Sequence, residues 1–136
     1  MIILLYFIFL FNSDIEYITY LKYCDSSLTK QNVKQAIYEL EIQYPEIVYA
    51  QAIWESGHFK SSICLKGNNL FGMKYPRRRH TLAIGTYKGH ARYRTWIESI
   101  IDYKIWQGKK MIKGDYIKYL RKRGYNHNKK YGNKFR

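Results

Sequence analysis

The stretch PEIVYAQAIWESG, residues 45–57, predicts a buried helix at the centre of the fold. Pro45 stands at the favourable first position of a helix, and Gly57 can end the helix at its carboxyl side. From Ile47 to Trp54 every side chain except Tyr49 and Gln51 is strongly apolar, nearly all round the helix, which is typical of a helix enclosed by other elements. We therefore expect a buried helix over about residues 45–56.

Glu55 is the one carboxylate in the carboxyl-terminal part of this helix. Burial disfavours its anion, the negative end of the helix dipole disfavours it again, and no basic residue lies within one turn upstream. These effects predict a raised pKa, and a carboxyl group that keeps its proton near neutral pH can serve as the general acid of a glycosidase. From spacing alone, an exposed glutamate at a helix end is the competing interpretation.

Further helices are predicted on both sides of this one. Residues 29–40 place apolar side chains at i, i+3, i+4 and i+7, with Thr29 as a candidate cap, which favours an amphipathic helix. Thr95 and Glu98 match a capping box and predict a helix over about residues 96–107. Two more helices are expected. One starts at Gly114 and Asp115 and ends at Gly124, and a last short one starts at Asn128.

Three short segments rich in aromatic or β-branched residues lie between the predicted helices. They cover residues 70–75, 82–88 and 90–94, and turn-forming or charged residues separate them. This pattern predicts a small antiparallel hairpin or a three-stranded sheet. Together with the helices, it indicates a mainly α member of the α+β class.

Length and composition indicate one folded domain with an uneven charge. The chain has 136 residues, of which 46% are hydrophobic, and this excludes the disordered class. Residues 1–103 carry 12 Lys and Arg against 9 acids, whereas residues 104–136 carry 12 against one, Asp115. A net charge of +14, concentrated in the last quarter, points to a polyanionic partner.

The cysteine and histidine pattern indicates no cofactor. The two cysteines form no CxxC pair, and the four histidines are scattered singly along the chain. Neither pattern is typical of a zinc site or a disulfide framework. We therefore expect neither a metal nor another cofactor.

The amino-terminal run MIILLYFIFLF, residues 1–11, suits the apolar region of a secretory signal but is too short to span a bilayer. Basic residues before it and a small-residue cleavage site after it are both missing. A buried or mis-started amino terminus is the alternative. We expect residues 1–25 to be an amino-terminal segment, a signal or an anchor, residues 26–136 to be the catalytic domain, and the protein to act in the cell envelope or outside the cell.

Residues 44–74, YPEIVYAQAIWESGHFKSSICLKGNNLFGMK, resemble the core of the glucosaminidase domain family of bacterial peptidoglycan hydrolases. Three hallmark blocks occur in order: AQA-x-x-E-S-G, a serine at Ser61, and NNLFG-x-K. A weaker likeness continues through residues 93–103 and 124–131. The resemblance implies a lysozyme-like fold, hydrolysis of the β-1,4 bond after N-acetylglucosamine, and Glu55 as the general acid.

The second catalytic group has three candidates. Glu98 lies in a segment that resembles the second acidic block of the family, although it also fits the capping box. Because no acid occurs between Glu55 and Glu98, where many family members have one, assistance by the acetamido group of the substrate is favoured. The resemblance also points to Tyr131, which matches a carboxy-terminal tyrosine of the family. The alternative is that Tyr131 is only a tyrosine of the core.

The residues expected to bind the substrate combine amides, a hydroxyl and aromatic rings. Amides can bond sugar hydroxyls and acetamido groups, and aromatic faces pack against pyranose rings. For Asn68 and Asn69, the alternative is that their side chains only shape the turn. The candidates are Trp54, Ser56, Asn68, Asn69, Phe71 and Tyr93.

Other functions remain open at this level. A muramidase-type lysozyme would use the same kind of glutamate. The arginine run at residues 77–79 and the basic tail with interleaved tyrosines suit a nucleic-acid-binding protein, but no known nucleic-acid motif accompanies them. A non-catalytic wall-binding module is a third alternative. The favoured partners are peptidoglycan strands and anionic wall polymers, with membrane contact only through residues 1–11 and a monomeric chain.

Overall fold

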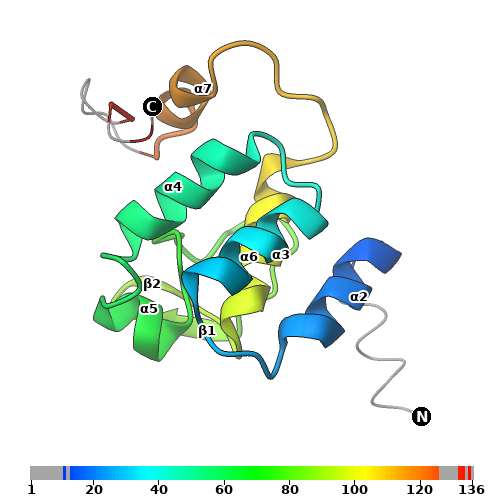
Figure 1. Ribbon diagram of the computed structural model, residues 1–136. Coiled ribbons are helices and arrows are strands. Elements are labelled where there is room, and N and C mark those ends of the chain that lie inside the picture. The colour runs from blue at the N-terminus through cyan, green and yellow to red at the C-terminus, as the bar shows by residue number, and fades with distance from the viewer. Residues whose placement is uncertain (1–10, 12, 126–131, 134, 136) are drawn as a thin grey trace.

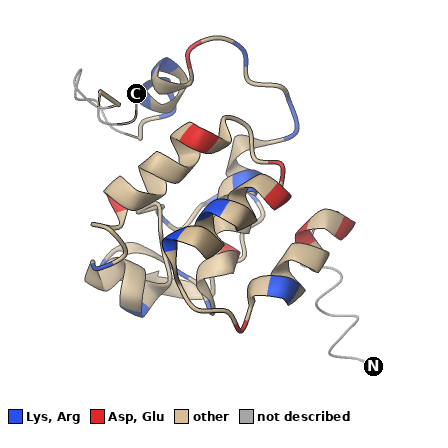
Figure 2. Cartoon of the chain, in the orientation of Figure 1, with Lys and Arg blue, Asp and Glu red and all other residues tan. Residues whose placement is uncertain are grey.

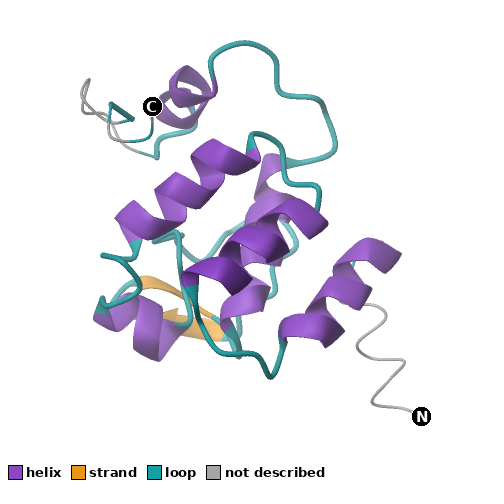
Figure 3. Ribbon diagram, viewed as in Figure 1, coloured by secondary structure: helices purple, strands orange, loops and turns teal. Residues whose placement is uncertain are grey.

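The computed structural model describes residues 11, 13–125, 132, 133 and 135. Helices dominate this part of the chain, and one small hairpin accompanies them (Figure 1; Figure 3). The elements are α2 (Asp14–Tyr23), α3 (Lys30–Glu39), α4 (Pro45–Glu55), α5 (Ser62–Gly67), β1 (Gly85–Tyr87), β2 (His90–Arg92), α6 (Trp96–Gln107) and α7 (Tyr116–Lys122).

Four of the predicted helices are confirmed as α3, α4, α6 and α7. The Thr29 side chain caps α3 by accepting the N–H of Asn32 at 3.1 Å. Pro45 occupies the first turn of α4, and Asp115 caps α7 through its carboxylate. The helix expected from Asn128 lies outside the described residues.

Two helices were not predicted. α2 packs on α3 and α6, so residues assigned by sequence to the amino-terminal segment belong to the folded unit. Its Tyr23 is 2% exposed, and the Tyr23 ring lies 5.8 Å from that of Trp96. α5 begins where Ser61 accepts the N–H of Cys64 at 3.1 Å.

The sheet is the smaller of the two predicted alternatives. β1 and β2 are antiparallel, with Thr86 opposite Ala91. Residues 70–75 run beside β2, and the Ala91 N–H donates to the Met73 carbonyl at 2.9 Å, but they form no strand. The reason is that the Asn69 side chain accepts the N–H groups of both Phe71 and Met73.

The core lies between α3, α4 and α6, and α5 packs on the hairpin (Figure 1). Val33, Val48 and Ile97 are among its fully buried side chains. The prediction of a buried central helix is confirmed for the inward side of α4, whereas Trp54 on the same helix is 46% exposed. The architecture is mainly helical with a small antiparallel lobe, the predicted α+β class. No helix among the described residues is both long and apolar enough to cross a bilayer.

A buried carboxylate ties the loop before the hairpin to α6. Asp102 is fully buried and accepts two hydrogen bonds from Arg79, at 3.0 and 2.9 Å, and one from the Leu82 N–H at 3.0 Å. The Tyr93 hydroxyl donates to it at 2.6 Å. Arg79 reaches Asp102 because the loop that carries it folds back over α6.

We predict that Asp102→Ala lowers the free energy of unfolding by about 3 kcal/mol, because it leaves Arg79 and Tyr93 without their buried acceptor. Lys22→Ala removes an ion pair whose side chains are 55% and 37% exposed and serves as the control, with little expected loss of stability. Urea unfolding of both variants measures the difference. Equal losses would show that Asp102 has no special structural weight.

Candidate active site

An open pocket of about 570 Å³ collects residues from both halves of the chain. The end of α4, the segment after α5, the hairpin, the end of α6 and the segment after α7 all contribute to it. Among the described residues of its lining, Glu55 is the only carboxylate. The lining consists of Glu55, Ser61, Ile63, Phe71, Gly72, Met73, Lys74, Tyr75, Pro76, Arg79, His90, Trp106, Arg123, Gly124 and Tyr125.

Glu55 is the last residue of α4 and is half-buried in this pocket. Its carboxylate lies against the backbone of Gly72, where a Cβ would stand 3.8 Å from Oε2. Gly72 has φ = 65°, a backbone conformation that residues other than glycine rarely adopt. The turn at Gly72 therefore brings the LFG segment to the carboxylate and leaves the other side of Glu55 to the pocket.

Ser56 shapes the chain reversal that follows Glu55. Its hydroxyl accepts the Phe59 N–H at 2.9 Å and lies 3.4 Å from the Ile53 carbonyl. The residues between them, Gly57 and His58, have positive φ, as does Phe59 itself. Ser56 is fully buried and does not line the pocket, so its contacts hold the end of α4 rather than face a sugar.

Asn68 and Asn69 bond the backbone around them. Asn68 ends α5 with φ = 54° and donates through Nδ2 to the carbonyls of Tyr93 and Arg94, both at 3.0 Å. Asn69 is 1% exposed, and its Nδ2 donates to the carbonyls of Met73 and Ala91. Neither lines the pocket, so these contacts support the turn-shaping alternative, and sugar binding by them stays a prediction.

Phe71 lines the pocket as part of an aromatic cluster. Its ring centroid lies 4.3 Å from that of Tyr103 on α6. The Tyr103 ring in turn lies 5.2 Å from Trp106 and 6.4 Å from Tyr125. The Tyr125 hydroxyl donates to the Phe71 carbonyl, so the segment after α7 is fastened to the segment that contacts Glu55.

The other predicted binding residues lie away from the pocket. Trp54 is on α4 next to Glu55 but does not contribute to the lining. Tyr93 is 1% exposed and holds Asp102, and burial together with that carboxylate raises its pKa. Tyr131 lies outside the described residues.

Glu98 is buried in α6, 3% exposed, and does not line the Glu55 pocket. The Thr95 hydroxyl lies 3.3 Å from its Oε1, and the Arg94 guanidinium lies 3.6 Å from its Oε2. Thr95 stands at the cap position as predicted, but its side chain contacts the Glu98 carboxylate instead of a backbone N–H. Burial raises the pKa of Glu98 to about 7, and the nearby Arg94 lowers it only in part.

Several lining residues were not predicted from sequence. Trp106, Arg123 and Tyr125 come from the basic, tyrosine-rich part of the chain, whose charge predicted only a polyanionic partner. Lys74 closes the NNLFG-x-K block, the one signal that could have indicated it. Among the described residues, no three His, Cys, Asp or Glu side chains lie close enough together to hold a metal.

A helical α+β domain with one carboxyl group in an open pocket, at the end of a buried helix, has the features of a lysozyme-like glycoside hydrolase. The chain belongs to the glucosaminidase family, described as mannosyl-glycoprotein endo-beta-N-acetylglucosaminidase, whose model matches residues 30–136. No curated protein and no solved structure is significantly similar to the chain. Membership of this family supports glycan hydrolysis as the general activity.

We predict that Glu98→Gln stabilises the protein at pH 8 but not at pH 4. The pKa of Glu98 lies at about 7 in the folded protein against 4.5 in the unfolded chain. The folded state therefore keeps a proton that the unfolded state releases between these values, and wild-type stability falls as pH rises through this window. Above pH 7 the loss amounts to roughly 3 kcal/mol, which the neutral amide avoids.

Urea unfolding of wild type and Glu98→Gln at pH 4, 6 and 8 measures this effect. The stability of the variant relative to wild type should rise with pH. A difference that stays constant over the range would contradict the raised pKa.

Proposed function

We propose that the protein hydrolyses the β-1,4 bond after N-acetylglucosamine in peptidoglycan strands, with Glu55 as the general acid. The observation that carries this proposal is the position of Glu55, which is the only described carboxylate in the lining of the pocket. A matching family model over residues 30–136 supports the reaction class. The open form of the pocket suits a glycan strand.

The position of Glu55 suits proton donation to a leaving oxygen. Its carboxyl group lies against the Gly72 turn, and α4 packs on α3 in the core. The half-buried Tyr125 ring lies in the same pocket and offers an apolar face to a sugar ring, whereas Phe71 is fully buried. A proton given to the glycosidic oxygen breaks its bond to the anomeric carbon, which develops positive charge.

The acetamido group of the substrate is the second group that this pocket favours. Glu98 and Asp102 do not line the pocket, and the Asp102 carboxylate is already bonded to Arg79 and Tyr93. The acetamido oxygen can attack the anomeric carbon as the leaving oxygen takes the proton of Glu55. Water then opens the oxazolinium ring, and Glu55 takes up the proton that the water releases.

We further propose that the protein acts in the cell envelope or outside the cell, where peptidoglycan lies. The net charge of +14 favours approach to an anionic wall. Trp106 and Arg123 contribute to the pocket from the carboxy-terminal third of the chain, which carries most of that charge.

Glu55→Gln should lower the rate of peptidoglycan hydrolysis by about 10²–10⁴-fold, because the amide has no proton to give to the leaving oxygen. Glu46→Gln is the matched control, since Glu46 is exposed at the other end of α4. Release of soluble fragments from purified peptidoglycan measures both. Unchanged hydrolysis by Glu55→Gln would exclude Glu55 as the acid.

Mass spectrometry of the fragments identifies the bond that is cleaved. Reducing ends of N-acetylglucosamine are expected from the proposed activity. Reducing ends of N-acetylmuramic acid would instead show a muramidase.

An N-acetylglucosamine-derived thiazoline should inhibit the hydrolysis competitively, because it resembles the cyclic oxazolinium species. The corresponding sugar without the fused ring is the control and should inhibit weakly. Equal inhibition by the two compounds would favour a second protein carboxylate over the acetamido group.

A further inference from the structure

A second pocket continues the catalytic one along the end of α6. It has a volume of about 480 Å³ and shares Trp106 and Arg123 with the pocket that holds Glu55. The two shared side chains make the pockets neighbours along one surface. The second pocket is lined by Trp106, Gln107, Gly108, Lys109, Lys110, Met111, Ile112, Lys113, Tyr119 and Arg123.

The lining of this second pocket is strongly cationic. Lys109, Lys110, Lys113 and Arg123 contribute four positive charges, and no acid occurs among its described lining residues. Figure 2 shows Lys and Arg along the loop between α6 and α7 and on α7 itself. The nearest acid in sequence, Asp115, caps α7 by accepting the N–H groups of Ile117 and Lys118. The pocket therefore suits an anionic ligand.

The loop that carries the lysines is fixed to the start of α4. The Gln43 side chain donates to the Lys110 carbonyl at 3.0 Å and accepts the Ile112 N–H at 2.7 Å. The Tyr44 hydroxyl lies 3.0 Å from the Ile112 carbonyl and 2.9 Å from that of Gly114. These contacts hold the loop backbone in place, which lowers the entropy lost when a ligand binds.

Arg123 is pre-positioned at the junction of the two pockets. Its guanidinium carbon lies 4.4 Å from the centre of the Trp106 ring and 5.5 Å from that of Tyr119. It also donates to the Tyr119 hydroxyl and, at 3.2 Å, to the Trp106 carbonyl. These contacts use only part of its five N–H donors, so others remain for a carboxylate.

We propose that this second pocket binds carboxylate-bearing substituents of the same glycan strand whose sugar ring occupies the Glu55 pocket. The proposal rests on the proposed function, because the shared Trp106 and Arg123 are what join the two pockets into one path. A separate anionic polymer could bind the second pocket without any connection to the Glu55 pocket. Lys109, Lys110 and Lys113 would then select acidic strands over neutral ones of the same length.

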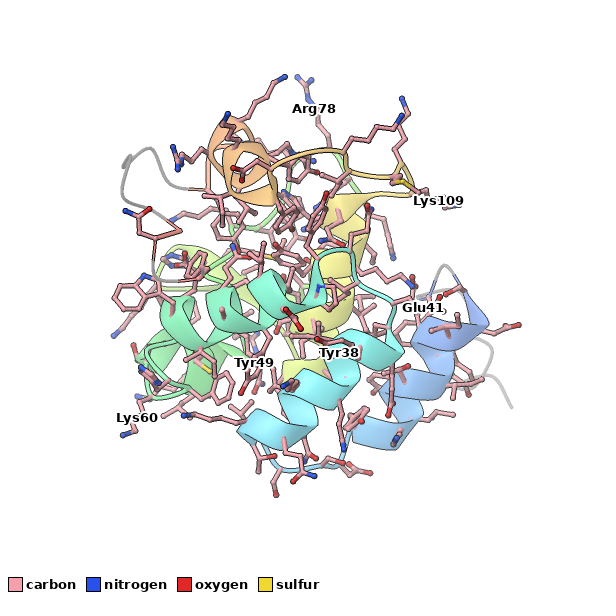
Figure 4. The ribbon with its side chains drawn as sticks, turned by 45° about the horizontal axis from the view of Figure 1, so that its top comes forward. Tyr38, Glu41, Tyr49, Lys60, Arg78 and Lys109 are labelled. Carbon is pink, nitrogen blue, oxygen red and sulfur yellow. The ribbon has the colours of Figure 1, made fainter. Side chains whose placement is uncertain are left out.

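The test measures binding in a Glu55→Gln background, so that no strand is cleaved. A triple variant, Lys109→Gln with Lys110→Gln and Lys113→Gln, is compared with a control triple of equal charge. The control changes Lys30, Lys60 and Lys66 to Gln, all of them exposed and outside both linings. Lys60 lies far from Lys109 across the molecule (Figure 4).

The probes are soluble peptidoglycan strands that retain their peptides and chitin oligosaccharides of matched length. The test triple should weaken binding of the acidic strands about tenfold at low salt, through the loss of three exposed charge contacts. It should leave the Kd of the neutral oligosaccharides unchanged, and the control triple should alter neither. Added salt should reduce the difference.

Equal weakening on both probes, or equal weakening by the control triple, would overturn the proposal. So would preferential binding of poly(glycerol phosphate), which would assign the pocket to a phosphodiester polymer instead. The proposed function is tested separately by wild-type fragment release. If wild type releases no fragments and the lysine-dependent binding persists, only the proposed function fails.

Discussion

A chain of buried hydrogen bonds joins the helices that build the site. The Tyr103 hydroxyl donates to Oε1 of Gln51 at 2.7 Å. The Tyr116 hydroxyl lies 2.5 Å from the Tyr103 hydroxyl. Gln107 donates to Tyr116 at 2.8 Å and also to the Gln43 carbonyl at 2.8 Å. Because each hydroxyl has one proton, the bonds run in one direction, from Gln107 through Tyr116 and Tyr103 to Gln51.

This chain of hydrogen bonds sets the position of both pockets. Gln51 lies one turn before Glu55 on α4, so the Tyr103 bond anchors the end of that helix that carries Glu55. The Tyr103 ring supports Phe71, and Tyr116 begins α7, the helix that leads to Arg123. Burial raises the pKa of Tyr116 to about 12, so its hydroxyl stays a donor at neutral pH. Polar groups that are buried and fully paired in this way favour a single arrangement of the helices.

The two pockets differ in charge. The Glu55 pocket contains one described carboxylate and the cations Lys74, Arg79 and Arg123, of which Arg79 is paired with Asp102. The second pocket has four cations and no such offset among its described residues. Part of the high net charge of the chain therefore lies beside the Glu55 pocket.

The sequence by itself determined the local elements and the residue of greatest chemical interest. Helical periodicity and caps were sufficient for α3, α4, α6 and α7, because each signal lies within a few residues. The position of Glu55 at the end of an apolar helix and the motif blocks indicated the acid. Only the tertiary structure decided which other side chains reach the pocket. Phe71 contributes to the lining, whereas Asn69 and Glu98 do not. Asn69 bonds the backbone of Met73 and Ala91, and Glu98 is buried against Thr95 and Arg94. Tyr125 bonds the Phe71 carbonyl and Arg123 contacts Trp106 because α7 packs against α6, a contact that no local pattern encodes.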